Sequence, residues 1–434
     1  MDRGLAALLP RVNAYRLRNS RLLRNNAIYL GGGVAVGILG YVFHFVVGRL
    51  LGPASYGIVA GSLSALYILT LPALVVQIVS TRFTSLAAGR HELGGVRPLL
   101  MQISGLSLVI GLPIAIGLIV FAPEASRYLQ VSDNRVIYVL AATTLATLLV
   151  AANRGALQGM RRFMSLVGNQ AIDMGSRVLF GGALVAAGLH ALGAVAALLL
   201  GPLFAYAQSV VLMLRVKGQP AAERTPLANV GRYAISAAIA AMGVTYLFNA
   251  DLVLAKHYLS SSEAGIYAAG SVLGRVAYFL GVTVASVMFP EVATLHARDE
   301  NHFHVVDASL LLMLALSAAL IAGYFLVPQL VLLPYGASFA PVRPYLGPFA
   351  IALGLLAVSN LLVNYFLSVN SQRFVAPLIG AGVLETILIA VFHSGIGQII
   401  AMLATSIGVL ALSLGGLYAV ERFRPARSGE LVDG

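Results

Sequence analysis

The residues best suited to chemistry are a few charged and polar side chains embedded in long apolar stretches. Tyr267, Ser271 and Arg275 recur every four residues within one such stretch, so they share one face of an α-helix. A guanidinium group on this face suits a phosphate, which it binds through two parallel hydrogen bonds. The structural alternative is an ion pair that neutralises Arg275 with a carboxylate such as Glu385 or Asp173.

A second polar stripe occupies the stretch 163–188. Its members, again four residues apart, are Ser165, Asn169, Asp173 and Arg177. Asp173 and Arg177 can neutralise each other along the helix, which is the structural interpretation. Because polar groups cannot face lipid, the stripe must face protein or water. The functional interpretation is a cavity wall that contacts a polar substrate.

Three further residues are candidates for substrate contact. Asn360 and Asn364 share a helical face and carry amide groups that suit sugar hydroxyls, although such amides also link helices to one another in membranes. Arg82 closes an apolar stretch, where its guanidinium either meets a substrate phosphate or extends to the lipid headgroups.

Two carboxylates are candidates for a coupling-ion site, Glu385 and Asp173. Glu385 lies midway along an apolar stretch without a neighbouring cation. It is expected to be neutral there and to act either as a proton site or as a buried hydrogen-bonding acid. Asp251 and Lys256, near the end of another apolar stretch, are expected to form a structural pair or a cap.

No catalytic residue, metal site or cofactor is predicted. The chain contains no Cys, which excludes disulfides and thiolate chemistry, and it has no GxxxxGK[ST] loop for a nucleotide. His296, His302 and His304 lie in a predicted cytoplasmic loop beside Asp299, but His302-x-His304 without a defined third partner does not predict a metal site, and no Ser-His-Asp arrangement is evident.

The elements that must position these residues are membrane-spanning helices. Of the 434 residues, 59% are hydrophobic and 10% are charged, and the mean hydropathy is +0.89. Charge this sparse excludes a soluble globule, a disordered chain and a nucleic-acid-binding protein. Since about 20 apolar residues cross a bilayer, the sequence predicts an all-α integral membrane protein with about twelve transmembrane helices, at 27–50, 55–81, 98–122, 135–155, 163–188, 190–214, 230–252, 263–289, 306–328, 344–368, 374–393 and 395–420. Pro72 is expected to bend the second of them.

The basic residues set the orientation. Most of the 28 Lys and Arg residues fall before residue 25, after residue 420 and in alternate connections, at 82–97, 154–162 and 215–232. Basic residues collect on the cytoplasmic side of a membrane, so both termini are predicted to be cytoplasmic. The expected organisation is a basic cytoplasmic segment at 1–26, a six-helix bundle at 27–214, a cytoplasmic linker at 215–229, a second six-helix bundle at 230–420 and a cytoplasmic tail at 421–434.

The second bundle repeats the first. A shift of 208 residues aligns Gly57 with Gly265, and a shift of 211 residues aligns Arg162 with Arg373. Six helices separate the copies, an even number, so the two repeats run parallel. This pattern predicts two pseudo-symmetric bundles around a central cavity, as in a transporter.

Three motifs resemble those of the bacterial polysaccharide (oligosaccharide/O-antigen) flippase family, which shares a superfamily with multidrug and toxin extrusion transporters. They are RLLGPASYG at 49–57, RGALQGMRRF at 154–163, and the run from Asp251 through Glu263, Gly265 and Arg275 to Pro290. The resemblance covers about residues 22–420.

The resemblance implies a flippase that carries a polyprenyl-pyrophosphate-linked oligosaccharide across a bacterial plasma membrane for surface polysaccharide biosynthesis, by alternating access. Arg275 and Arg177 would then hold the phosphates. Expected partners are membrane lipids, the lipid-linked substrate, a polysaccharide polymerase and glycosyltransferases, but no nucleic acid. The alternative is a proton- or sodium-coupled multidrug exporter of the related superfamily. A membrane enzyme is disfavoured because no loop is long enough for a folded catalytic domain.

Overall fold

The protein is built from α-helices. The structure, a computed structural model, describes residues 3–89, 93–216 and 232–423, and no strand occurs in these ranges. The helices are α1 (Arg3–Leu69), α2 (Leu71–Gly89), α3 (Val96–Val120), α4 (Ala122–Tyr128), α5 (Arg135–Gly159), α6 (Phe163–Leu184), α7 (His190–Leu214), α8 (Arg232–Leu247), α9 (Ala250–Tyr258), α10 (Ser261–His296), α11 (Phe303–Leu326), α12 (Pro328–Leu332), α13 (Leu346–Ser368), α14 (Val375–Val391) and α15 (Ile396–Arg422).

Ten helical segments in the described residues are long and apolar enough to cross a membrane. Two of them, Gly31–Leu69 and Phe163–Leu214, contain 39 and 52 residues, which is more than one crossing needs. Each contains a glycine with positive φ, Gly52 and Gly188, where the helix is kinked. The predicted all-helical, multi-pass architecture is therefore confirmed, whereas the number of twelve crossings stays a prediction.

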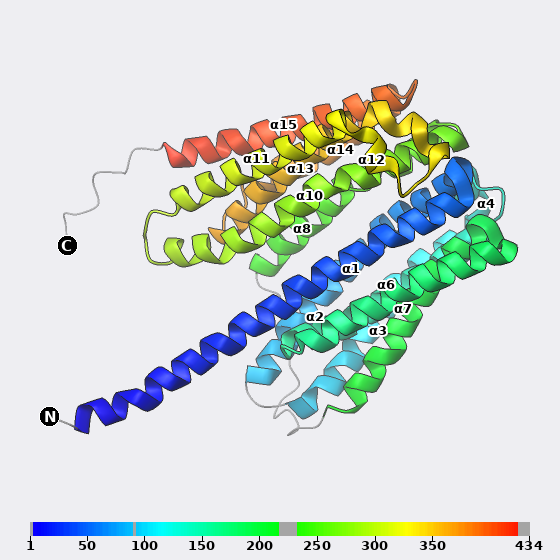
Figure 1. The fold of residues 1–434 in the computed structure, drawn as a ribbon. Coiled ribbons are helices and arrows are strands. Elements are labelled where there is room, and N and C mark those ends of the chain that lie inside the picture. Colours follow the sequence, from blue (N-terminus) through cyan, green and yellow to red (C-terminus); the bar gives the residue numbers. More distant parts are fainter. Residues whose placement is uncertain (1–2, 90–92, 217–231, 424–434) are drawn as a thin grey trace. The chain divides into compact units, whose positions relative to one another are not determined.

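The chain forms two compact units, each with its own packed helices. The first comprises Met1–Leu50, Pro72–Ala122 and Asn134–Ala228, and the second comprises Leu51–Leu71, Pro123–Asp133 and Asn229–Gly434. In the first unit, α5 packs against α3 and α7, and α6 packs against α7. In the second unit, α13 is central and contacts α10, α11 and α15 (Figure 1). The predicted linker and tail lie largely outside the described residues, and the predicted domain boundaries stay a prediction.

Of Pro72, Pro113 and Pro202, only Pro72 coincides with an interruption between two helices. Helix α1 ends at Leu69 and α2 begins at Leu71, because Pro72 has no N–H to donate to the carbonyl four residues earlier. Pro113 and Pro202, in contrast, lie inside α3 and α7 without ending either helix. The bend expected at Pro72 is thus present.

A close crossing of two helices in the second unit depends on glycine. The part of α1 that follows its kink meets the start of α10, where a Cβ atom on Gly57 would lie 2.9 Å from the backbone nitrogen of Gly265. A Cβ atom on Gly265 would overlap the carbonyl group of Pro53. These two glycines are the pair that the internal repeat aligns, so equivalent positions of the two repeats touch each other.

Substituting Gly265 by alanine should lower the free energy of unfolding by about 1–3 kcal/mol, because an added methyl group overpacks the contact. Chemical unfolding of the purified protein in detergent measures the change. The matched control is Gly105→Ala, since Gly105 lies in α3 with no atom near its Cβ position. There, alanine should leave stability unchanged or raise it slightly. Equal stability of the two variants would contradict the close crossing.

Candidate functional site

The second unit contains a broken helix next to a buried arginine. Helix α8 ends at Leu247 and α9 begins at Ala250, so the break falls within the candidate span Ala238–Tyr258. The carbonyl of Phe248, released from the helical pattern, accepts a hydrogen bond of 2.8 Å from Arg275. The guanidinium group also lies 4.4 Å from the centre of the Phe248 ring. Discontinuous helices of this kind form the substrate and ion sites of many transporters.

The polar face of α10 points into protein at this break. Tyr267, Ser271 and Arg275 are 0%, 1% and 6% exposed, which agrees with the predicted stripe. Tyr267 donates a hydrogen bond of 2.9 Å to the Oδ2 atom of Asp251, and Ser271 approaches the same oxygen at 3.5 Å. Arg275 also reaches the side-chain oxygen of Asn249 at 3.4 Å. Arg275 therefore belongs to a cluster of buried polar side chains with Tyr267, Ser271, Asp251 and Asn249.

Some polar atoms of this cluster remain unused. The Nε atom of Arg275 and the Oδ1 atom of Asp251 are buried and have no hydrogen-bond partner among the described residues. A buried donor or acceptor without a partner costs about 1–3 kcal/mol. The cluster therefore has one unused hydrogen-bond donor, on Arg275, and one unused acceptor, on Asp251. A polar ligand or an ion would bind to them.

Glu385 of α14 adds a second buried carboxyl group. It is fully buried, and neither of its oxygen atoms has a hydrogen-bond partner among the described residues. The group lies close enough to Asp251 for the two carboxyls to interact electrostatically. Two buried carboxyls that interact electrostatically favour a shared proton or a bound cation. The two coupling-ion candidates differ in this respect. Both oxygens of Asp173 accept hydrogen bonds from arginines, whereas those of Glu385 have no partner among the described residues.

The alternative of an ion pair between Arg275 and Glu385 or Asp173 does not hold in the described part of the chain. The hydrogen-bond partners of Arg275 there are a carbonyl and an amide oxygen, and Asp173 pairs with other arginines in the first unit.

The pair predicted between Asp251 and Lys256 is also wrong. Asp251 bonds to α10, while the buried Nζ atom of Lys256 has no partner in the described part of the chain. The stem of Lys256 instead lies along Gly61, where a Cβ atom would come within 2.8 Å of its Cγ atom. Both residues are 1% exposed, so the first and the last turn of α9 that carry them are buried in the protein.

The polar stripe of the first unit forms a closed network. Asp173 accepts from Arg177 at 2.8 Å, as predicted, and also from Arg154 of α5 at 2.7 Å. Arg154 donates in addition to Asn169 at 2.7 Å. Asn169 in turn donates to the backbone carbonyl of Ala205 on α7 at 2.6 Å. These hydrogen bonds link α5, α6 and α7. Each carboxylate oxygen of Asp173 accepts a hydrogen bond from one arginine.

Sequence reasoning missed Arg154. Arg154 lies at the end of the helix predicted at 135–155, but it was counted with the cytoplasmic basic residues at 154–162, whereas α5 continues to Gly159. The signal was present, since no proline or charge before Arg154 ends the helix that begins at Arg135.

The remaining candidates are Asn360, Asn364 and Arg82. Asn364 donates to the backbone carbonyl of Asn360 at 2.8 Å, so its amide is occupied within its own helix. Asn360 is 8% exposed. Arg82 is exposed near the end of α2. No group of three metal-ligating side chains occurs in the ranges that the structure describes.

The sequence pattern of a known family matches most of this chain. The family is described as "polysaccharide biosynthesis protein", and the match covers residues 22–296, more than half of the sequence. The chain belongs to this family. No curated protein sequence matches it.

Solved structures of similar fold are transporters of the MOP superfamily. An inward-facing multidrug resistance MATE transporter matches with a TM-score of 0.69 at 11% identity, over 88% of this chain and 96% of its own. An outward-facing one matches with a TM-score of 0.61 at 14% identity, over 92% and 96%. A MOP superfamily transporter from Pyrococcus furiosus, described with a binding pocket of reversed polarity, matches with a TM-score of 0.58 at 14% identity, over 92% and 95%.

The chain therefore belongs to the polysaccharide biosynthesis protein family and shares its fold with solved transporters of the MOP superfamily. The family expected from the three sequence motifs is therefore confirmed, as is the two-bundle helical fold.

Proposed function

We propose that this protein is a flippase for a polyprenyl-pyrophosphate-linked oligosaccharide. It takes the lipid-linked sugar from the cytoplasmic leaflet of a bacterial plasma membrane to the outer leaflet, for the synthesis of a surface polysaccharide. The sugar and pyrophosphate pass through a polar cavity while the lipid tail stays in the bilayer. Access alternates between the two sides, and solved proteins of this fold occur in inward-facing and outward-facing conformations.

The observation that carries this proposal is Arg275 at the broken helix. Its guanidinium lies at membrane depth with an unused Nε donor, and phosphate oxygens are the acceptors that best match an arginine fork. Membership of a polysaccharide biosynthesis family supports a sugar-bearing ligand. In this proposal Arg177 and Asp173 stabilise the first unit, while Tyr267, Ser271 and Asn249 complete the phosphate site.

The direct test is to identify what the protein carries. Gentle extraction from its own host membrane, followed by native mass spectrometry, should show a bound species with the mass of a polyprenyl pyrophosphate plus sugars. Reconstituted vesicles should then move that species to the opposite leaflet, where a glycan-cleaving enzyme can reach it. Binding of phospholipids only, together with no movement of the sugar lipid, would contradict the proposal.

A cation-coupled multidrug exporter is the second candidate. The observation that favours it is the buried carboxyl pair of Asp251 and Glu385, because indispensable acids in the cavity are what a cationic drug and a coupling ion require. The cation of Arg275 beside them opposes a cationic drug. Resistance of expressing cells to cationic dyes, lost in Glu385→Gln, would favour the exporter over the flippase.

The proposed orientation places both termini in the cytoplasm, as the distribution of basic residues indicates. The substrate is then delivered by glycosyltransferases on the cytoplasmic side and consumed by a polysaccharide polymerase on the outer side. Cysteine labelling of a residue introduced at position 428, with a reagent that cannot cross membranes, tests this orientation.

A further inference from the structure

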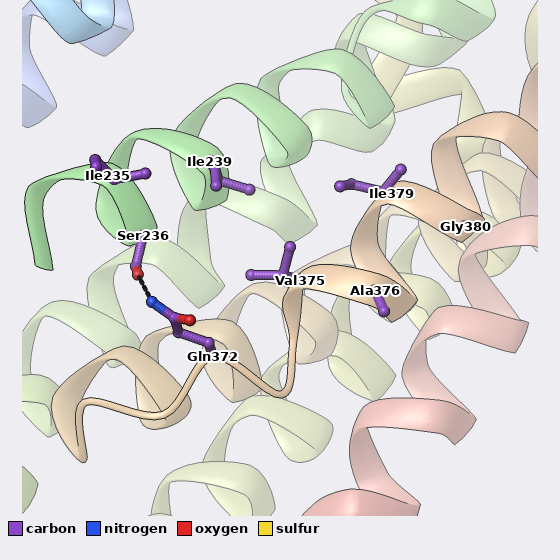
Figure 2. Close-up of a pocket in the computed structure, with 8 residues that line it drawn as sticks. All are labelled: Ile235, Ser236, Ile239, Gln372, Val375, Ala376, Ile379 and Gly380. Atoms are coloured by element: carbon purple, nitrogen blue, oxygen red, sulfur yellow. Dashed lines mark hydrogen bonds between the residues drawn. The ribbon is translucent and has the colours of Figure 1, made fainter. Parts of the chain in front are cut away.

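An apolar groove runs between α8 and α14 in the second unit. Its walls are formed mainly by Ile235, Ile239, Val375 and Ile379, and its volume is about 690 Å³ (Figure 2). This size lies within the range of about 300–1,000 Å³ that is typical of ligand pockets. None of these four residues was singled out by the sequence, and the groove lies outside the Arg275 cluster.

Contacts between the two helices frame the groove at both ends. At one end the amide of Gln372 donates a hydrogen bond of 2.9 Å to the hydroxyl of Ser236 (Figure 2). Beyond the other end, Leu378 packs so closely on Gly243 that a Cβ atom there would lie 2.6 Å from a Leu378 methyl carbon. The groove is therefore a gap between two fixed points of one helix pair.

The open side of the groove suits hydrocarbon. Ile235 and Ile379 are 53% and 55% exposed, and in a membrane protein such side chains face lipid chains or an apolar ligand. Polarity is confined to the Ser236–Gln372 end. The neighbouring Arg373 is 48% exposed in spite of its ion pair with Glu421, so a positive charge is available at the same end. The complementary ligand is a long apolar chain with a negatively charged head.

We propose that this groove binds the polyprenyl tail of the substrate before translocation, with the phosphate end at Ser236, Gln372 and Arg373. The inference rests on the proposed function and adds a binding site for the lipid part. The phosphate end lies at the start of both helices, whereas the break that ends α8 and Glu385 of α14 lie beyond the opposite end of the groove. A tail held here would thus extend from the phosphate end toward the polar cluster.

Photocrosslinking tests the site. The full-length protein in lipid nanodiscs is irradiated with a polyprenyl phosphate that carries a diazirine on its tail, and the labelled peptides are mapped. Label should concentrate on residues 235–239 and 375–380, and unlabelled polyprenyl phosphate should remove it, whereas excess phosphatidylglycerol should not. Equal labelling of the groove by a diazirine phospholipid would assign it to ordinary bilayer lipid and overturn the proposal.

A variant that fills the groove provides a second test of the binding site. Gly380 lines the groove, and no atom lies within 4 Å of its Cβ position, so Gly380→Phe should fill the space without a clash. Labelling of the groove should fall at least tenfold. The matched control is Gly416→Phe on α15, where the Cβ position is equally open and labelling should not change.

The outcomes separate this inference from the proposed function. If the Gly380→Phe variant is labelled like the wild type and still transports the sugar lipid, the groove is not the binding site of the tail. The proposal that the protein is a flippase is then unaffected. If the groove is labelled specifically but the protein does not transport the sugar lipid, the binding site is supported. The proposal that the protein is a flippase is then contradicted.

Discussion

Replacing Arg275 by alanine is expected to reduce translocation of the sugar lipid about 100-fold or more, while the protein still inserts into the membrane. Each hydrogen bond to a charged group contributes about 1.5–3 kcal/mol, and a phosphate bound by the guanidinium fork would lose two of them. Every 1.4 kcal/mol corresponds to a factor of ten. Flipping by reconstituted vesicles, measured at equal amounts of inserted protein, gives the ratio.

Two controls separate this role from a general need for charge. Arg275→Lys keeps the positive charge but loses the planar fork, and we expect it to retain part of the activity. Arg298→Ala removes the same charge from an exposed position after the end of α10, and we expect full activity. Wild-type glycan export by Arg275→Ala would show that the phosphate site lies elsewhere.

Replacing Asp173 by alanine is expected to lower the free energy of unfolding of the first unit by about 3–5 kcal/mol, the usual effect of removing one partner of a buried ion pair. The side chain of Asp173 is the carboxylate that Arg154 and Arg177 share. Without it, two buried guanidinium groups stand close together with no intervening negative charge. Denaturant or thermal unfolding in detergent, with the accumulated amount of protein in the membrane, measures the effect.

The exposed pair of Asp307 and Arg422 is the matched control. Their side chains are 40% and 35% exposed, so Asp307→Ala should cost less than about 1 kcal/mol. If Asp173→Ala unfolds like the wild type yet fails to transport, the network is part of the transport site rather than a structural tie. A double substitution of Asp173 and Arg154 should recover part of the stability, because it also removes one of the unpaired charges.

The sequence was sufficient to predict which faces of the helices are buried. The four-residue spacing of Tyr267, Ser271 and Arg275 correctly indicated one inward face, since helical geometry alone determines it. The local pair of Asp173 and Arg177 was predicted for the same reason. Both predictions concern residues on one helix, whose relative positions follow from the helical repeat.

Partners on different helices could not be predicted in the same way. The proximity of Glu385 to Asp251 depends on how α14 packs against α9, and nothing in either apolar stretch specifies that register. The break at Asn249 was missed although Asn is a common N-cap residue, because the stretch Ala238–Tyr258 is long and apolar enough to cross a membrane as one helix. The pairing expected for Lys256 failed because sequence proximity was taken for spatial proximity.

The contact between Gly57 and Gly265 has a mechanical consequence. The closest contacts there are made by backbone atoms of the two helices rather than by side chains. Separating the two helices at this point would therefore require no side-chain rotamer to change, whereas any larger residue at either position would hold the backbones apart.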